Sequence, residues 1–223
     1  VARWLVVEGA KHIVLVSRKG RPSPQVEDGA LWRELAPLVA GHEAGSGVKT
    51  TQTEEQQQQP WIIKVLACDV SSLSSCEGLL ARITTTEGLP PVKGVFHAAG
   101  VLADASLEQQ SVTGIEQVYR PKVGGAWNLH DATTTPPHNH HVDHFVLFSS
   151  VASLYGNFGQ SNYSAANACL DALTVHRRSR GLAAQSIQWG PWVEQGMAAK
   201  LRQHLDKVGI KGISNELGLR VMG

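Results

Sequence analysis

Short apolar runs recur along the chain, and amphipathic segments separate them. Five runs are rich in Val, Ile and Phe: HIVLVS at His12 to Ser17, WIIKVLA at Trp61 to Ala67, VKGVFHA at Val92 to Ala98, HFVLFS at His144 to Ser149, and AAQSIQW ending at Trp189. Strands of a parallel sheet that helices cover on both faces have this continuous apolar character. The pattern predicts an α/β fold with a Rossmann-like, doubly wound parallel sheet.

The segments between the apolar runs carry helical periodicity. They predict helices over Glu27 to Ala40, Ser72 to Glu87, Leu107 to Ala132 and Gln160 to Arg180. Val1 to Glu8 has the pattern of a helix tail that Gly9 stops, since glycine is the usual residue just after a helix end.

Two polar stretches do not fit a compact domain. Residues 41–60 run through Gly, Ser and Thr into four consecutive glutamines, which predicts a flexible surface insertion. Residues 133–141 contain Pro136-Pro137 and several histidines, which predicts a loop extension. His138, His140, His141 and His144 are of a type that binds zinc, but no spacing fixes their geometry, so we expect a solvated loop and no metal site.

Composition and charge favour one globular domain that binds neither nucleic acid nor membranes. Twenty Lys and Arg oppose nineteen Asp and Glu, and no apolar run reaches the ~20 residues that span a bilayer. Three scattered cysteines favour a reducing, cytoplasmic location. The chain begins Val1-Ala2-Arg3-Trp4 without an initiating Met, so we expect a cut inside a longer chain, which leaves an organellar address open.

The segment from Phe145 to Leu173 is the most informative for chemistry. A buried strand ends at Ser149-Ser150, a glycine-bearing loop follows, and the next helix carries Tyr163 and Asn167 four residues apart. Ligands of open α/β sheets bind beyond the carboxyl ends of the strands, and residues four apart share one helix face. Ser150, Tyr163 and Asn167 are therefore expected to converge on one carbonyl group, while Ser149 is assigned to packing.

These residues resemble those of ketoreductase domains of modular polyketide synthases, which belong to the short-chain dehydrogenase superfamily. Ser150 precedes Tyr163 by thirteen residues, and Tyr-x-x-x-Asn replaces the more usual Tyr-x-x-x-Lys. Lys122, in YRPKVGGAWNLH, occupies the position of the displaced lysine. HIVLVSR, ACDV, VFHAAGVLADASL and SIQWGPWVEQGMA also resemble that family, in the same order.

The resemblance implies an enzyme that uses NADPH to reduce a β-ketoacyl thioester, carried on the phosphopantetheine of an acyl carrier protein, within a multidomain synthase. Tyr163 is then the general acid, Lys122 the cation that stabilises its phenolate, and Ser150 a hydrogen-bond donor to the substrate oxygen. Asn167 holds a water or side chain in the proton path. The alternatives are a solvated Lys122 and an Asn167 that only satisfies a backbone group.

The resemblance also assigns cofactor and stereocontrol residues. Arg18 follows the His12 to Ser17 strand, where arginine accommodates the 2′-phosphate of NADPH, and Ser17 either shares that phosphate or is a plain turn residue. Asp104 matches the last residue of a Leu-Asp-Asp signature, and Tyr155 stands in place of a tryptophan. Together they indicate a D-3-hydroxyacyl product. The alternative role of Asp104 is to cap a helix near Leu107. Asp69 and Val70 are expected to flank the adenine. The small-residue turn of Ala98, Ala99 and Gly100 is expected to let the backbone approach the cofactor.

The family's first strand and its Gly-rich phosphate loop are missing from this chain, so we expect residues 1–223 to be a partial catalytic domain. We expect the chain alone neither to fold stably nor to bind NADPH tightly, because the missing strand is central and the loop holds the pyrophosphate. Two other hypotheses remain: a non-catalytic structural subdomain of a synthase, and a free-standing short-chain dehydrogenase.

Overall fold

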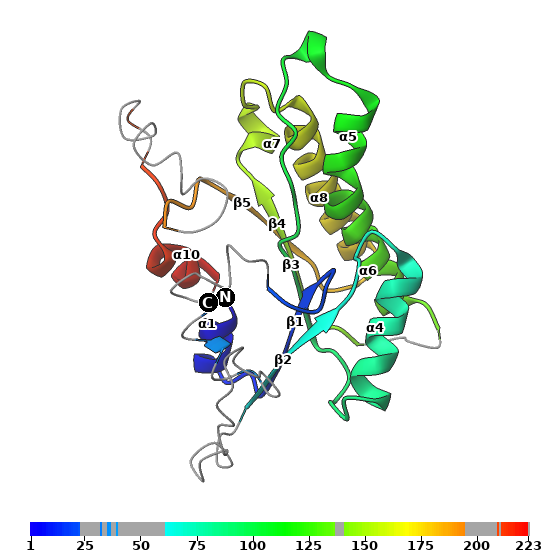
Figure 1. Ribbon diagram of the computed structural model, residues 1–223. Helices are drawn as coiled ribbons and strands as arrows, with labels where there is room; N and C mark the ends of the chain where they lie inside the picture. Colours follow the sequence, from blue (N-terminus) through cyan, green and yellow to red (C-terminus); the bar gives the residue numbers. More distant parts are fainter. Residues whose placement is uncertain are drawn as a thin grey trace, which may run out of the picture. The chain divides into compact units, whose positions relative to one another are not determined.

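The computed structural model describes residues 1–22, 32, 35–36, 39, 61–136, 141–194, 209 and 211–222. These residues form two compact units, one from residues 1–69 and 81–90 and the other from 70–80 and 91–223 (Figure 1). Every strand pairing in them is parallel, which confirms the predicted α/β class. The insertion predicted at 41–60 lies outside the described residues, as do His138 and His140.

The first unit is built on a two-stranded sheet. Strand β1 (His12–Ser17) pairs with β2 (Ile62–Ala67), with His12 opposite Ile62, and both strands match the predicted runs closely. Helix α1 (Ala2–Val7) ends before Gly9, whose φ of 96° is a conformation that glycine adopts without strain. Val39 forms a β-bridge with Ile63, so the predicted Glu27 to Ala40 helix does not reach its expected end. Ile13, Trp32, Val39 and Ile63 form the core of this unit.

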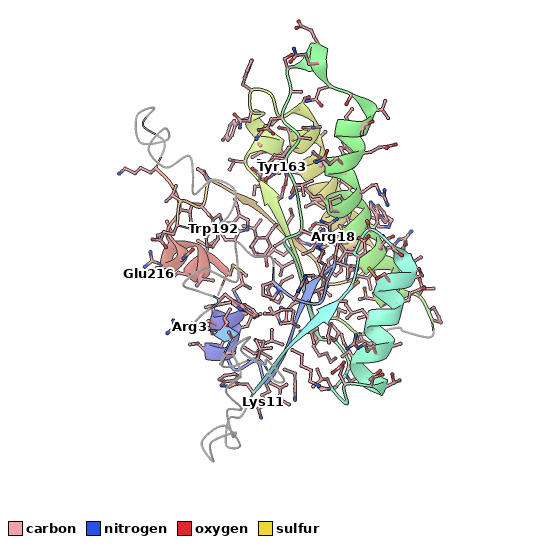
Figure 2. The ribbon with its side chains drawn as sticks, in the orientation of Figure 1. Arg3, Lys11, Arg18, Tyr163, Trp192 and Glu216 are labelled. Atoms are coloured by element: carbon pink, nitrogen blue, oxygen red, sulfur yellow. The ribbon has the colours of Figure 1, made fainter. Side chains whose placement is uncertain are left out.

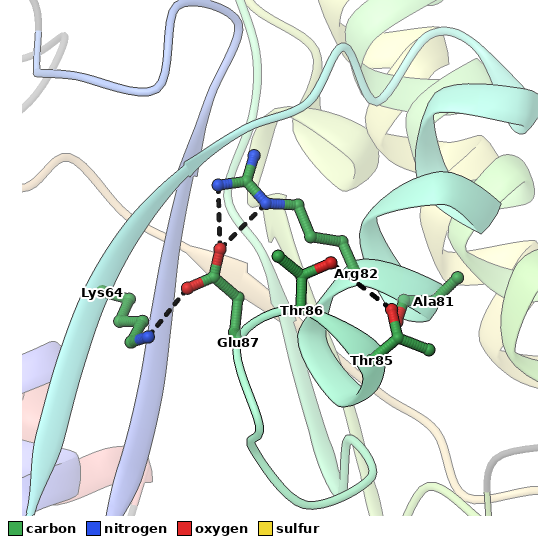
Figure 3. A network of polar contacts seen from close by, with 6 residues as sticks. All are labelled: Lys64, Ala81, Arg82, Thr85, Thr86 and Glu87. Carbon is green, nitrogen blue, oxygen red and sulfur yellow. Dashed lines mark hydrogen bonds and ion pairs between the residues drawn. The ribbon is translucent and has the colours of Figure 1, made fainter.

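A carboxylate ties the sheet of the first unit to the end of helix α4 (Leu73–Thr85), which runs from the second unit into the first. Glu87 Oε2 accepts a hydrogen bond from Lys64 Nζ of β2 at 2.7 Å, and Oε1 accepts one from Arg82 Nε at 2.9 Å (Figure 3). These two partners hold the pKa of Glu87 below its ordinary value. The helix predicted over Ser72 to Glu87 ends two residues early, at Thr85. Glu87, just beyond it, connects Lys64 of β2 to Arg82 of α4.

The second unit contains a three-stranded sheet in the order β3-β4-β5. Its strands are β3 (Gly94–His97), β4 (His144–Ser150) and β5 (Gln185–Trp189), and helix α8 (Ser161–Ser179) packs against β4. The core combines residues from the sheet and its covering helices: Val95, Ala126, Phe145, Leu147, Leu170 and Leu173. Short helix α7 (Ala152–Tyr155) follows β4, and α10 (Asn215–Met222) lies near the end of the chain.

The single helix predicted over Leu107 to Ala132 is wrong, because this segment contains four elements. A 3-10 turn η3 (Leu107–Gln109) precedes α5 (Val112–Tyr119), a π-helical turn η4 (Arg120–Gly124) and α6 (Gly125–Thr134). The π-helical turn lies at Pro121, which has no N–H to donate to the preceding turn. Helix α6 also continues into the predicted 133–141 loop, since Thr133 is buried and donates its hydroxyl to the Leu129 carbonyl at 2.7 Å.

In the described ranges, no helix combines the length and apolar character needed to cross a membrane.

Candidate active site

The carboxyl end of β4 places two serines in different environments. Ser149 is buried, and its hydroxyl donates to the main-chain carbonyl of Asn167 at 3.3 Å. Ser150 is partly exposed, and its Oγ accepts the N–H of Ala152 at 3.2 Å. That bond uses an acceptor position of Ser150 and not its proton, so the hydroxyl can still donate to a substrate oxygen.

Lys122 is buried beside Tyr163. Its side chain is carried by the π-helical turn η4 and is only 3% exposed, so the alternative of a solvated lysine is wrong. The ammonium donates to the Phe148 carbonyl of β4 at 3.1 Å and lies 5.2 Å from the centroid of the Tyr163 ring. Burial lowers the Lys122 pKa to about 8, while the negative charge of Asp171 acts in the opposite direction.

Helix α8 presents Tyr163 and Asn167 one turn apart. The Asn167 side chain is fully buried, and its Nδ2 donates to the Tyr163 carbonyl at 2.8 Å. Its Oδ1 is buried and has no hydrogen-bond partner among the described residues. Because an unpaired buried acceptor costs free energy, this oxygen is a ready position for a donor such as water. The Nδ2 atom of Asn167 therefore satisfies a backbone carbonyl, whereas its Oδ1 does not take part in that bond.

The start of α8 is joined to the 101–106 segment. Asn162 Nδ2 donates to the Ala103 carbonyl at 2.8 Å, and the Ala105 N–H donates to the Gly159 carbonyl at 2.9 Å. Asp104 accepts a hydrogen bond from Gln160 Nε2 at 3.0 Å. The capping role considered for Asp104 is wrong, because Ser106 precedes η3 and Ser111 caps α5.

The residues expected to hold the cofactor belong to both units. In the first unit, Arg18 comes directly after β1 and is exposed (labelled in Figure 2). Asp69 of the same unit is partly buried. Ser17 Oγ donates to the Arg21 carbonyl at 2.6 Å and accepts the Arg21 N–H at 3.0 Å, so it forms a turn. Its hydroxyl proton is used within the chain, which favours the plain turn role over a phosphate contact.

In the second unit, the expected cofactor residues lie just before α4 and just after β3. The Val70 carbonyl accepts a hydrogen bond from Asn128 Nδ2 of α6 at 2.8 Å. Ala98, Ala99 and Gly100 come directly after β3. A Cβ at Gly100 would lie 3.6 Å from Lys122 Nζ, so this small-residue turn passes close to the buried ammonium.

Two residues beside the candidate site were not singled out from the sequence. His97, buried at the end of β3, has its Nε2 2.9 Å from the Lys122 carbonyl, and since a carbonyl only accepts, this nitrogen carries the proton. Asp171 lies on α8 and accepts three side-chain hydrogen bonds. The sequence contained a signal for Asp171, because positions 163, 167 and 171 form a polar stripe at four-residue spacing. His97 offered none, since histidine inside an apolar run is not distinctive.

A family model described as the KR domain matches residues 1–194. The chain is 42% identical over 194 residues to the phenolphthiocerol synthesis polyketide synthase type I Pks15/1 of Mycobacterium marinum, covering 86% of the chain and 8% of that protein. It is 40% identical over 226 residues to the spectinabilin polyketide synthase system protein NorB of Streptomyces orinoci, covering 98% of the chain and 9% of that protein. The chain thus spans less than a tenth of the length of these two relatives.

Solved ketoreductase structures share the fold. An A-type ketoreductase from a modular polyketide synthase superposes with a TM-score of 0.76 at 34% identity, over 99% of this chain and 41% of that one. The ketoreductase from the first module of phoslactomycin biosynthesis in Streptomyces sp. HK803 superposes with a TM-score of 0.77 at 30% identity, over 99% and 45%.

Proposed function

Because the chain belongs to the ketoreductase (KR) domain family of modular polyketide synthases, we propose that it reduces a β-ketoacyl thioester on an acyl carrier protein to the 3-hydroxyacyl thioester. The observation that carries this proposal is the buried Lys122 ammonium 5.2 Å from the centroid of the Tyr163 ring. A cation kept out of water beside a phenol has a chemical role that a solvated lysine lacks. This arrangement favours a working reductase over a non-catalytic structural subdomain.

In the proposed reaction Tyr163 protonates the oxygen of the substrate ketone. NADPH, when bound, supplies the hydride to the carbonyl carbon. As negative charge grows on the oxygen, the Ser150 hydroxyl donates a hydrogen bond to it and Tyr163 gives up its proton. Lys122 is charged at pH 7, since its pKa is about 8, and stabilises the phenolate that results. Water at the open Oδ1 of Asn167 returns a proton toward Tyr163.

NADPH is the proposed cofactor because Arg18 is exposed at the carboxyl end of β1, where a guanidinium can pair with a 2′-phosphate. Asp69, Val70 and the turn Ala98 to Gly100 are the further proposed contacts. The phosphate role of Ser17 is the weakest of the set, since Arg21 occupies its hydroxyl. The three cysteines, which the structure describes outside any disulfide, fit the reducing cytoplasm that we assign to the reaction.

We also propose that Asp104 directs the substrate to give the D-3-hydroxyacyl product. Its hydrogen bond to Gln160 joins the 101–106 segment to the residue just before α8, three positions ahead of Tyr163. A substrate entering between this segment and Tyr163 would contact Asp104. One structural neighbour is described as an A-type ketoreductase, so chiral analysis of the product is an informative comparison.

The Tyr163→Phe variant tests the reaction. The change removes the phenol hydroxyl and keeps the ring beside Lys122, so reduction of a β-ketoacyl thioester should fall by about 10²-fold or more. NADPH binding, measured by fluorescence titration, should stay within about fivefold, since one hydrogen bond contributes roughly 1 kcal/mol or less here. The assay uses a longer polypeptide that carries this chain together with an upstream strand and Gly-rich loop, because the chain alone is not expected to bind NADPH tightly.

Tyr155→Phe is the matched control, because Tyr155 is 86% exposed and has no proposed part in proton transfer. It should leave turnover unchanged. Full activity in Tyr163→Phe would refute the proton-donor role, and absence of reduction in the unmodified protein with NADPH bound would favour the structural subdomain.

A further inference from the structure

Asp171 lies two helical turns after Tyr163 on the same face of α8. Positions 163, 167 and 171 follow one another at four-residue spacing, so the carboxylate continues the line of Tyr163 and Asn167. Asp171 is partly buried, and the reaction proposed above does not use it directly.

The Asp171 carboxylate is surrounded by hydrogen-bond donors from α7 and β5. Oδ1 accepts from Ser186 Oγ, and Oδ2 accepts from Ser153 Oγ at 2.8 Å and from Gln188 Nε2 at 2.9 Å. An ionised carboxylate only accepts hydrogen bonds, so this set matches the charged form. Burial acts to raise the Asp171 pKa, but the hydrogen bonds from Ser186, Gln188 and Ser153 outweigh it, and the pKa is lowered.

These contacts hold the segment that contains Ser150. Ser153 belongs to α7, which begins two residues after Ser150, and its hydroxyl is anchored by Asp171 of α8. On the other side, the Val151 N–H donates to the Trp189 carbonyl of β5 at 3.0 Å. The chain just beyond Ser150 is thus fixed between β5 and the helix that carries Tyr163. Loss of the hydrogen bonds to Asp171 would release the contact of this segment with α8 and leave its contact with β5.

Asp171 also provides a negative charge that acts on Lys122. The Lys122 ammonium contacts the Phe148 carbonyl of β4 and lies near the Tyr163 ring of α8, while His97 of β3 contacts the main-chain carbonyl of Lys122. His97 is neutral at pH 7, because burial lowers its pKa to about 4. Asp171 raises the Lys122 pKa against the effect of burial and so favours the ammonium form.

We propose that Asp171 is a positioning residue of the reductase, whose carboxylate fixes the Ser150 segment against α8 and keeps Lys122 protonated. Its effect on turnover rests on the proposed function, whereas its effect on the protonation of Lys122 does not. The two effects are separable, because Ser186→Ala removes one hydrogen bond to Asp171 and leaves the charge in place.

The test compares Asp171→Asn with Ser186→Ala and a control, Asp143→Asn. Asp143 is an exposed aspartate, with 59% of its side chain accessible, that pairs with Lys93 at 3.5 Å, so the control makes the same chemical change away from Lys122. The titration of Lys122 is followed by NMR of protein labelled at lysine Cε with carbon-13, and the signal is assigned by its loss in Lys122→Met. This measurement needs neither substrate nor turnover.

We expect Lys122 in Asp171→Asn to lose its proton at lower pH than in the unmodified protein, and the basic limb of the kcat profile to move with it. kcat should fall about tenfold or more, since small displacements of reacting groups cost up to about 10²-fold, while KM changes little. Ser186→Ala should lower kcat and leave the Lys122 titration in place. Asp143→Asn should change neither.

An unchanged Lys122 titration in folded Asp171→Asn would overturn the electrostatic half of the proposal. Undiminished kcat in both Ser186→Ala and Ser153→Ala would overturn the positioning half, and these variants serve if Asp171→Asn does not fold. A protein that shows the Lys122 shift but reduces no β-ketoacyl thioester would contradict the proposed function and leave the link between Asp171 and Lys122 standing.

Discussion

Lys122 shows how a functional group can oppose stability at the scale of one residue. Its pKa is about 8 in the folded protein against 10.5 for an unperturbed lysine, because burial disfavours the charged form. A lowered folded-state pKa means that stability is highest above pH 10.5, falls as the pH drops from 10.5 to about 8, and levels off below that, where both states are protonated. The difference corresponds to roughly 3 kcal/mol at neutral pH. This loss of stability accompanies the burial of a cation beside Tyr163.

Lys122→Met should therefore raise the free energy of unfolding at pH 7, by up to roughly 3 kcal/mol, and abolish reduction. At pH 10 the gain should shrink, since the lysine is then neutral in the folded protein. Urea unfolding at both pH values measures the effect. Lys93→Met, a change at a lysine with 63% of its side chain accessible, should alter stability little at either pH. A less stable Lys122→Met protein would contradict the argument.

Arg18 is the residue on which the proposed preference for NADPH depends. A charge-assisted hydrogen bond from its exposed guanidinium to the 2′-phosphate contributes roughly 1.5 to 3 kcal/mol. Arg18→Ala should weaken NADPH binding by about tenfold or more and NADH binding much less, because NADH lacks that phosphate. Fluorescence titration with both cofactors measures the ratio. Equal losses for the two would exclude phosphate recognition by Arg18.

At the scale of elements, helix α10 depends on a glycine that faces a tryptophan. Gly218 is buried, and a Cβ at this position would overlap the Trp192 ring (Figure 2 labels Trp192). Trp192 in turn packs edge-on against Trp189 at 5.0 Å between ring centroids, which connects α10 to the end of β5. The close approach of helix and ring is what excludes a side chain here.

Gly218→Ala should consequently destabilise the docking of α10, although alanine favours a helix over glycine by about 1 kcal/mol. Overpacking of a filled site costs typically 1 to 3 kcal/mol, which exceeds that gain. Gly78→Ala in α4 is the control: nothing lies within 4 Å of its added Cβ, so it should be neutral or stabilising. Thermal unfolding and tryptophan fluorescence report the result, and a more stable Gly218→Ala protein would mean that Trp192 moves freely.

At the scale of the whole molecule, the two units differ in how their sheets are supported. Strand β4 has partners on both sides and contributes the fully buried Leu147, whereas β1 and β2 form a two-stranded sheet in the described part of the chain. Two-stranded sheets have marginal stability unless other elements pack on them. The second unit is therefore expected to be the more resistant of the two to opening.

Hydrogen exchange followed by mass spectrometry should show this difference. Amides of β4, in residues 144–150, should exchange more slowly than those of β1, in residues 12–17, because opening β4 breaks two ladders. A small dose of urea should increase the contrast. Equal protection of the two strands would show that the units open together.

The sequence by itself determined the strands and the family. β1 and β4 begin where their apolar runs begin, and the spacing of Ser150, Tyr163 and Asn167 with the displaced Lys122 identified the family. These features are local: period, residue type and spacing are all read along the chain.

Only the tertiary structure decided which groups meet. The burial of Lys122 depends on a bond to Phe148, 26 residues away, and Asp104 meets Gln160 across 56 residues. The donors around Asp171 likewise come from other elements, α7 and β5. Hydrogen bonds of this kind leave no period in the sequence, because their partners are brought together only when the helices and strands pack.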